Sequence, residues 1–180
     1  MVGGYRKYKD RLVNMFHIKL IAHKEITDDE LNEVIKIKSA QWHYSYEDQL
    51  QWIKKNIKDA DIHVLLYFNE NSVAYLNLID IDLKLGEVFV RGFGVGNVCA
   101  VEKGRGFGFE IMSEVNRYIL NSNKVGLLFC KDQLLKFYRS LGWKELEPNE
   151  YKVKGDNLKV MAINIQCYTE LLIEYDGIIF

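Results

Sequence analysis

The sequence has a single proline, three cysteines and a formal net charge of only −1 among its 180 residues. Cys99, Cys130 and Cys167 are odd in number and lack metal-ligand spacing, which favours reduced thiols in a cytoplasmic protein over a disulfide framework. The near-zero net charge argues against bulk nucleic-acid binding. No apolar run approaches the roughly 20 residues that a membrane helix needs. No histidine pair is spaced to bind a metal. We therefore expect no metal, membrane or nucleic-acid partner.

What is present is typical of a globular domain. Hydrophobic residues make up 48% and charged residues 27% of the chain, which is enough to form a sizeable core. Residues 1–14 are basic but lack the apolar segment of a signal peptide. We expect residues 1–14 to be a peripheral extension and residues 15–180 to form a single domain.

Hydrophobic periodicity and helix-capping signals predict an α+β fold. Thr27 and Glu30 form a capping-box pattern, and Ser45 with Asp48 marks a second helix start. Gly142 is a typical residue just after a helix. The predicted strands are 16–22, 62–68, 73–83, 87–98, 125–130, 151–153 and 159–167, with helices at 28–38, 46–57, about 108–121 and about 134–141. The order β-α-α-β-β-β-α-β-α-β-β indicates a mixed, mostly antiparallel sheet flanked by helices.

The glycine-rich segment 103–108 lies between a predicted strand and a predicted helix. Glycines there let a ligand approach the backbone, and a helix N-terminus attracts anions. No P-loop string is present. A second glycine series at 92, 94 and 96 leads into more strand or loop, whereas a dinucleotide-binding fingerprint must open a helix. These three glycines predict either a bulge or a strand face that another backbone or a ligand approaches closely.

Two motifs together resemble the GNAT N-acetyltransferase superfamily. Lys103-x-x-Gly106-x-Gly108 fits the acyl-CoA-binding pattern [RQ]-x-x-G-x-[GA], with lysine at its first position. The segments 126–130 (GLLFC) and 137–143 (FYRSLGW) match a later strand and helix end of the family. The resemblance covers about residues 15–164 and is greatest to the branch of aminoglycoside 2′-N-acetyltransferases and nodulation acyltransferases. It implies transfer of an acetyl group from acetyl-CoA to a primary amine of a small amine or amino sugar, and a homodimer.

The resemblance also implies roles for particular residues. Backbone N–H groups of residues 104–108, which include Gly104 and Phe107, would bind the CoA phosphates, with added charge from Lys103 and Arg105. Backbone groups at Asn97 and Val98 would face the acetyl carbonyl. Tyr138 would protonate the leaving thiolate, although its spacing also suits a core aromatic residue.

The general base and the acceptor site are less well marked. Many relatives carry a glutamate in the fourth strand, but residues 92–96 contain no carboxylate. Glu87 and Asp80 are the candidate bases, with Asp82 and His43 further options and a water chain as the alternative. The alternative for these carboxylates is solvation at strand ends, with no catalytic role.

Arg91 either faces the acceptor or pairs with Asp80 or Asp82. His43 belongs to an aromatic cluster that either lines the acceptor side or packs, made up of Trp42, His43, Tyr44 and Tyr46. Because of the lysine at 103 and the missing carboxylate, a non-catalytic acyl-CoA-binding or interaction module stays open as an alternative. Acylation of a protein N-terminus or lysine side chain is a further option.

Overall fold

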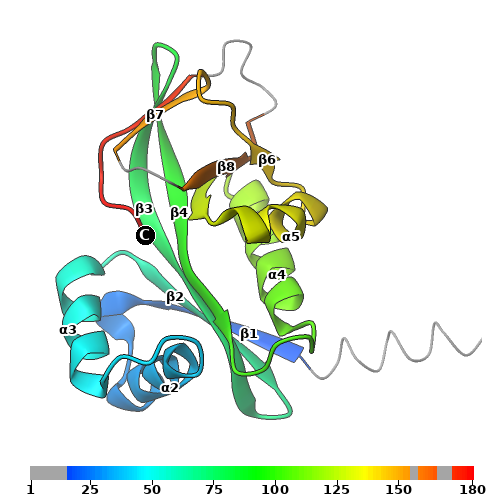
Figure 1. Cartoon of the computed structure of the whole chain (residues 1–180). Helices are drawn as coiled ribbons and strands as arrows, with labels where there is room; N and C mark the ends of the chain where they lie inside the picture. The colour runs from blue at the N-terminus through cyan, green and yellow to red at the C-terminus, as the bar shows by residue number, and fades with distance from the viewer. Residues whose placement is uncertain (1–15, 155–157, 166–171) are drawn as a thin grey trace, which may run out of the picture.

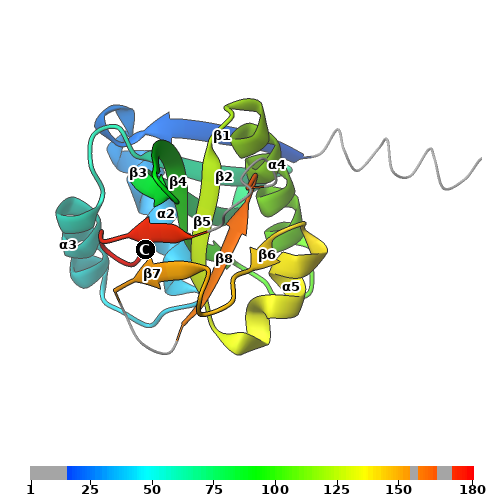
Figure 2. The ribbon, with the colours of Figure 1, turned by 90° about the horizontal axis from the view of Figure 1, so that it is seen from above.

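The computed structural model describes residues 16–154, 158–165 and 172–180, so the predicted extension 1–14 lies outside the described residues. Within them, one mixed sheet is flanked by helices on both faces (Figures 1 and 2). This confirms the α+β prediction. No helix among the described residues is long and apolar enough to cross a membrane.

The sheet runs in the order β1-β2-β3-β4-β5-β8-β6, and β9 joins β3 to β7 beside that path. Neighbouring strands are antiparallel except for the β4–β5 and β7–β9 pairs, which are parallel. The strands are β1 (Phe16–Ala22), β2 (Ile62–Phe68), β3 (Asn71–Leu85), β4 (Val88–Ala100), β5 (Val125–Cys130), β6 (Lys144–Glu145), β7 (Tyr151–Val153), β8 (Lys159–Ile163) and β9 (Ile173–Tyr175).

The helices begin where capping residues predict them. The Thr27 side chain accepts a hydrogen bond from the Glu30 backbone N–H at the start of α2 (Asp28–Ser39), and Ser45 caps α3 (Tyr46–Asn56) in the same way. α4 (Phe107–Asn121) and α5 (Leu135–Ser140) follow later, and short 3₁₀ turns occur at η1 (His23–Glu25) and η2 (Asp132–Leu134).

Two hydrophobic cores lie on opposite faces of the sheet. Ile35, Ile37 and Ile53 bring α2 and α3 into one core, whereas Ile111 and Val115 bring α4 into the other. All five of these side chains are buried. Because apolar burial is worth about 25 cal/mol per Å², these two faces fix the helices on the sheet.

Two irregularities in β4 shape the centre of the molecule. Tyr75 pairs with Cys99 and Asn77 with Gly96, so two residues of β4, Asn97 and Val98, lie opposite the single residue between them on β3. This is a β-bulge, which leaves one residue unpaired and re-aims its neighbours. Asn97 takes a left-handed conformation with φ 53°. β4 and β5 pair only over residues 92–94 and 125–127, and beyond that point the two strands separate.

Three predictions about the strands need correction. The strand predicted at 159–167 ends at Ile163, because Asn164 takes a left-handed conformation with φ 64°; Cys167 lies outside the described residues. β3 continues to Leu85, so the turn begins at Gly86 rather than at residue 84. The short strands β6 and β9 were not predicted, because two or three residues carry too little periodicity.

Candidate active site

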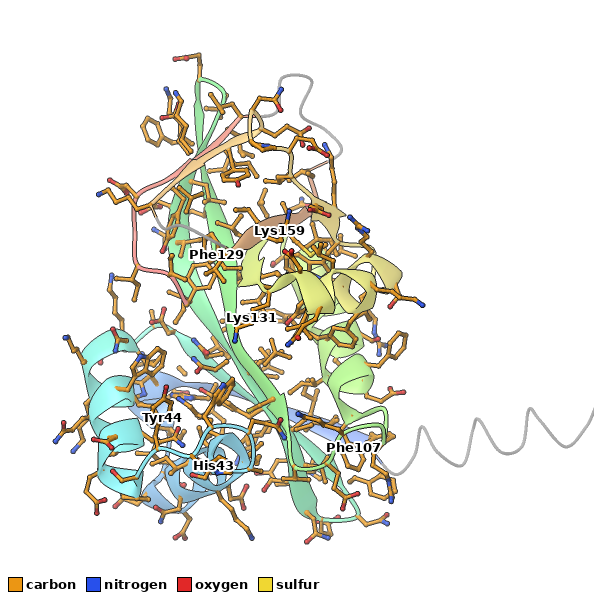
Figure 3. The ribbon with its side chains drawn as sticks, in the orientation of Figure 1. His43, Tyr44, Phe107, Phe129, Lys131 and Lys159 are labelled. Carbon is orange, nitrogen blue, oxygen red and sulfur yellow. The ribbon has the colours of Figure 1, made fainter. Side chains whose placement is uncertain are left out.

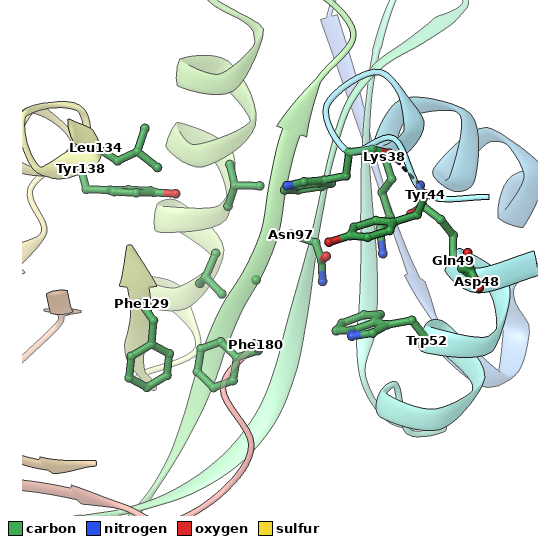
Figure 4. Close-up of a pocket in the computed structure, with 14 residues that line it drawn as sticks. Lys38, Tyr44, Asp48, Gln49, Trp52, Asn97, Phe129, Leu134, Tyr138 and Phe180 are labelled. Carbon is green, nitrogen blue, oxygen red and sulfur yellow. Dashed lines mark hydrogen bonds between the residues drawn. The ribbon is translucent and has the colours of Figure 1, made fainter. Parts of the chain in front are cut away.

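A cleft of about 810 Å³ opens where β4 and β5 separate. This volume is in the range of small-molecule sites, about 300–1,000 Å³. Residues 95–98 of β4 run along it. One side, which we call the α5 wall, consists of Phe129, Leu134 and Tyr138; the other, the α2–α3 wall, consists of Lys38, Trp42, Tyr44, Asp48, Gln49 and Trp52. Figure 4 shows β4 passing between the two walls.

The bulge in β4 places Asn97 and Val98 on this cleft. The Asn97 Nδ2 atom donates to the Asn77 Oδ1 atom over 2.8 Å, which ties the bulge to the neighbouring strand. A bulge frees backbone N–H groups from the sheet. This stretch of β4 can therefore offer hydrogen-bond donors to a carbonyl oxygen in the cleft.

Tyr138 faces β4 from the α5 wall (Figure 4). Its side chain is 5% exposed, and its ring packs edge-on against Trp143 with ring centroids 6.5 Å apart. Trp143 is anchored in turn, because its Nε1 atom donates to the Asn116 Oδ1 atom of α4 over 2.9 Å. Among the described residues the Tyr138 hydroxyl has no hydrogen-bond partner. Burial raises the pKa of Tyr138 well above its usual value near 10, so the phenol keeps its proton at neutral pH.

The glycine-rich turn after β4 leads directly into α4. Gly104 and Gly106 have φ values of 78° and 80°, a left-handed conformation that favours glycine, and a Cβ atom added at either would meet nothing within 4 Å. Gly106 occupies the N-cap of α4 without any side-chain cap. The first N–H groups of α4 are therefore open to an external anion, supported by the helix dipole. This open, uncapped backbone fits the phosphates of a nucleotide-type cofactor.

The charged residues of the same turn point away from the protein core. Lys103 and Arg105 are both exposed. Arg105 lies 3.7 Å from Glu102 in an exposed ion pair and 5.8 Å from the ring centroid of Phe107, which is buried. Gly108 lies against Phe137 of α5, with its added Cβ at 3.7 Å from the ring. The turn thus connects the start of α4 to the helix that carries Tyr138.

The carboxylates proposed as general bases lie elsewhere. Glu87 is in the β3–β4 turn, where its side chain is 95% exposed and 3.7 Å from Lys84. Asp80 lies on β3 and forms ion pairs with Arg91 and, over 3.1 Å, with Lys124. Arg91 also lies 3.3 Å from Asp82. None of these residues lines the cleft, so the structure supports the ion-pair interpretation of Arg91 and the solvated interpretation of Glu87.

The aromatic cluster between α2 and α3 divides between the cleft and the surface. Trp42 and Tyr44 line the cleft, whereas His43 is exposed and does not. Figure 3 shows His43 and Tyr44 in the loop that joins the two helices. Tyr46 is exposed and donates to the Asn32 side chain over 2.6 Å. Trp42 and Tyr44 thus follow the cleft-lining interpretation, whereas His43 and Tyr46 lie on the surface and neither line the cleft nor pack in the core.

Lys38 and Phe180 are among the cleft residues that the sequence did not single out. Lys38 lies in the last turn of α2 and is only 4% exposed, although lysine is usually placed on the surface. Phe180 reaches the cleft from far along the chain and packs on Gly94 and Gly96. A Cβ atom at Gly94 would overlap the Phe180 ring, and one at Gly96 would lie 2.8 Å from the Phe180 backbone. The glycine series is thus a strand face closely approached by another backbone, as one of its two interpretations proposed.

Neither described cysteine is suited to act as a nucleophile. Cys99 and Cys130 are both buried. Burial raises the pKa of Cys99 to about 12 and that of Cys130 to about 11, so both thiols stay protonated at neutral pH. No group of three or more potential metal ligands occurs in the described part of the chain. The described cysteines therefore supply no thiolate to the cleft at neutral pH.

Comparison with known proteins identifies the fold. A family profile described as an acetyltransferase (GNAT) domain matches residues 22–146. Among solved structures, Escherichia coli ElaA is 19% identical, with a TM-score of 0.58, and the match covers 82% of this chain and 99% of that chain. Campylobacter jejuni N-acetyltransferase PseH is 16% identical, with a TM-score of 0.54 and coverage of 81% and 96%. A search of curated protein sequences finds no significant match.

One of the similar structures is a complex with coenzyme A. An aminoglycoside 6′-N-acetyltransferase complexed with coenzyme A is 11% identical, with a TM-score of 0.59 and coverage of 82% and 96%. At such identities these structures show the shared fold, while the family profile shows the family. The comparisons do not single out the aminoglycoside 2′-N-acetyltransferase branch, which stays a prediction. The chain belongs to the GNAT acetyltransferase family and is an acyltransferase that uses acyl-CoA.

Proposed function

We propose that this acyltransferase transfers an acetyl group from acetyl-CoA to a primary amine of a small molecule. The observation that carries the proposal is the placement of the unpaired Tyr138 hydroxyl across one cleft from the Asn97–Val98 bulge. These two features supply a proton donor and carbonyl-binding donors to the same space. They are what thioester aminolysis needs from a protein.

The glycine-rich turn is proposed to hold the cofactor. The free N–H groups at Gly106, Phe107 and Gly108 would bind pyrophosphate oxygens, and the helix dipole adds roughly half a positive charge. Lys103 and Arg105 are exposed beside them and would add charge-assisted hydrogen bonds. The pantetheine arm would then run between β4 and β5 toward the bulge.

Different groups in the cleft would assist different parts of the reaction. Backbone N–H groups at Asn97 and Val98 would stabilise the negative charge that develops on the carbonyl oxygen, a contribution of a few kcal/mol in a dry site. The amine nitrogen bonds to the acetyl carbon as the carbon–sulfur bond breaks, and the Tyr138 hydroxyl gives its proton to the sulfur. Burial keeps the Tyr138 phenol protonated at neutral pH, so it has a proton to give, and a proton from water in the cleft then restores the phenol.

The amine is proposed to react without a carboxylate base. Glu87 and Asp80 lie outside the cleft, and the one carboxylate that lines it, Asp48, belongs to the α2–α3 wall. A fraction of any amine is unprotonated at neutral pH, and the proton released on attack can leave through water in the open mouth of the cleft. We do not retain Glu87, Asp80, Arg91 or His43 as site residues.

The cleft favours a small acceptor over a protein. Phe180 stands in it beside Gly94 and Gly96, and Trp42, Tyr44 and Trp52 surround the α2–α3 side. These side chains shape a confined space rather than a long groove for a peptide. Cytoplasmic acetyl-CoA would be the donor, and a homodimer remains part of the proposal.

Release of free thiol from acetyl-CoA, measured across a panel of amines, tests this function. The panel should include small primary amines, amino sugars, amino acids and peptides with free N-termini. We expect turnover on small amines and none above background on peptides. CoA binding without thiol release on any amine would contradict the proposal, and turnover restricted to peptides would replace the small acceptor with a protein.

A further inference from the structure

Lys38 is the only lysine or arginine that is buried among the described residues. It lies in the last turn of α2, and its side chain reaches the cleft beside Tyr44, Trp52 and Asn97 (Figure 4). Packing of the fold does not need a charge there, because the surrounding positions of α2, such as Ile35 and Ile37, are apolar core residues. A buried cation on the acceptor side therefore calls for a separate explanation.

The Lys38 ammonium has no counter-charge within the described structure. Its Nζ atom lies 4.4 Å from the ring centroid of Trp52, a cation–π contact, and forms no ion pair or hydrogen bond with a described residue. Asp48 lines the same cleft but lies beyond the 4.0 Å of an ion pair with it. Burying an unpaired charge is costly, and a cation–π contact returns only part of that cost, about 2 kcal/mol or less.

The protonation state of Lys38 follows from its surroundings. Burial lowers the pKa of Lys38 to about 8, and the nearby Cys99 opposes this slightly. His63, whose own pKa burial lowers to about 4, is neutral at pH 7 and adds no charge beside Lys38. A pKa of about 8 is still above neutrality, so the ammonium form predominates at pH 7.

A second unpaired donor lies next to Asn97. The Asn77 Nδ2 atom is the one buried side-chain polar atom that has no hydrogen-bond partner among the described residues. The Asn77 Oδ1 atom already accepts a hydrogen bond from Asn97. Because buried polar groups are normally satisfied, the Asn77 amide lacks one acceptor. A bound molecule or water that brings an oxygen atom would supply it.

We propose that Lys38 binds an anionic oxygen group of the acceptor, so that the acceptor is an amine that also carries a carboxylate or a phosphate. This inference rests on the proposed function, which makes the α2–α3 wall the acceptor side. It narrows the acceptor class: amino acids and acidic amino sugars fit, whereas polycationic amino sugars would place a second positive charge near the Lys38 ammonium. Lys38 is thus a specificity residue rather than a proton carrier.

Matched acceptor pairs test the inference directly. Alanine and ethylamine carry the amine on the same two-carbon skeleton and differ in one carboxylate, and phosphoethanolamine and ethanolamine differ in a phosphate. The ratio of kcat/KM within each pair measures acid recognition. We expect the ratio to favour the acid by roughly 10- to 100-fold in at least one pair, the range of a charge-assisted hydrogen bond. The pair with the larger ratio identifies carboxylate or phosphate.

Two variants assign that preference to Lys38. Lys38→Met keeps the length and removes the charge, so the ratio should fall to near 1 through KM. Lys38→Arg keeps the charge but cannot release a proton near neutral pH, so it should restore much of the ratio. Both variants must first retain the wild-type melting temperature and CoA affinity; Lys38→Gln, which is also neutral, replaces Lys38→Met if that variant does not.

The possible outcomes separate this inference from the proposed function. A wild-type ratio near 1, or a ratio that Lys38→Met leaves unchanged, overturns the inference while turnover still supports the proposed function. Equal loss of kcat on both members of a pair in Lys38→Met and Lys38→Arg would make Lys38 a base and also overturn it. If no amine is turned over, the proposed function fails, and calorimetry of the same pairs with the CoA-bound protein still measures the preference for the acid.

Discussion

The α5 wall and the α2–α3 wall of the cleft are built on different principles. The α5 side offers mainly backbone groups and one hydroxyl: the uncapped start of α4, the β4 bulge and Tyr138. The α2–α3 side offers side chains: a buried ammonium, a carboxylate and three aromatic rings. Backbone groups suit a donor that is the same in every reaction of a family, whereas side chains can be exchanged to suit one acceptor.

The two walls also differ in the contacts that position their side chains. Tyr138 is positioned by a short chain of contacts through Trp143 to Asn116 of α4, all within neighbouring elements. Lys38 and Phe180 come from distant parts of the sequence, and both line the cleft. Changes on the α5 side should therefore affect the reaction with every acceptor, and changes on the α2–α3 side should affect which acceptor is used.

Substituting Tyr138 by phenylalanine should have the largest effect on the α5 side. The change removes one hydroxyl that has no partner among the described residues and leaves the packing against Trp143 in place. We expect kcat to fall roughly 10- to 1000-fold for all acceptors, the usual range for a lost proton donor. CoA affinity should stay similar. Steady-state kinetics with two unlike amines measures this, and an unchanged kcat would remove Tyr138 from the mechanism.

Replacing Gly106 by aspartate tests the anion site at the start of α4. The carboxylate would lie where a phosphate is proposed to bind, and charge repulsion should weaken CoA binding by roughly 100-fold. Gly106→Asn is the matched control, since asparagine has the same shape, is neutral and tolerates the left-handed conformation. Calorimetric titration with CoA measures both variants. Equal affinities for the two would place the phosphates elsewhere.

Acid should destabilise the protein through His63, which lies under the α2–α3 side. Its Nε2 atom contacts the His23 ring over 2.9 Å and its Nδ1 atom contacts the Tyr75 hydroxyl over 2.9 Å. Burial lowers the pKa of His63 from 6.5 to about 4, so the unfolded chain binds the proton more tightly than the folded one. Stability is therefore full above pH 6.5 and falls as the pH drops toward 4.

Urea denaturation at pH 7 and pH 5 measures this loss. The free energy of unfolding should be about 2 kcal/mol lower at pH 5, roughly a 30-fold change in the unfolding equilibrium. His63→Gln keeps hydrogen-bonding groups but does not titrate, and its stability should change less over the same interval. If it shows the same pH dependence as the wild type, another group is responsible.

Shortening Phe180 should give the smallest effect and should affect acceptor choice alone. Its ring packs on Gly94 and on Phe129, with ring centroids of the two phenylalanines 5.0 Å apart. Phe180→Ala would enlarge the acceptor space, and we expect kcat/KM for bulkier amines to rise by roughly 10-fold relative to the smallest. Phe180→Leu should fall between. A uniform decrease across all amines would instead indicate a structural role.

The sequence predicted the α5 side better than the α2–α3 side for a physical reason. The turn at 103–108 and the segment 126–143 are local patterns, and strands such as Val125–Cys130 and Ile62–Phe68 were predicted to the residue. Lys38 has helical spacing like any surface lysine, so only the fold shows that it is buried. The contact of Phe180 with Gly94 depends on long-range packing that no local pattern encodes.

The position of the candidate carboxylates in the sequence also did not predict whether they face the cleft. Glu87 and Asp80 were near the right strand in sequence, but the strand is long and they lie outside the cleft. A strand of 13 residues is longer than a small-molecule site is wide, so residues at its two ends cannot both face the same ligand. Proximity in sequence was therefore a poor guide to which acid groups face the ligand.

The contact of Phe180 with Gly94 and Gly96 also bears on the order of folding. β4 joins β5 soon after α4 is made, whereas Phe180 must return from the far end of the described chain to reach the same strand. Closing the longer loop costs more chain entropy and slows contact formation. We therefore expect β4 and β5 to pair before Phe180 packs on β4 and on Phe129 of the α5 wall. A folding intermediate of this protein would have the cleft open but not yet filled by the Phe180 ring.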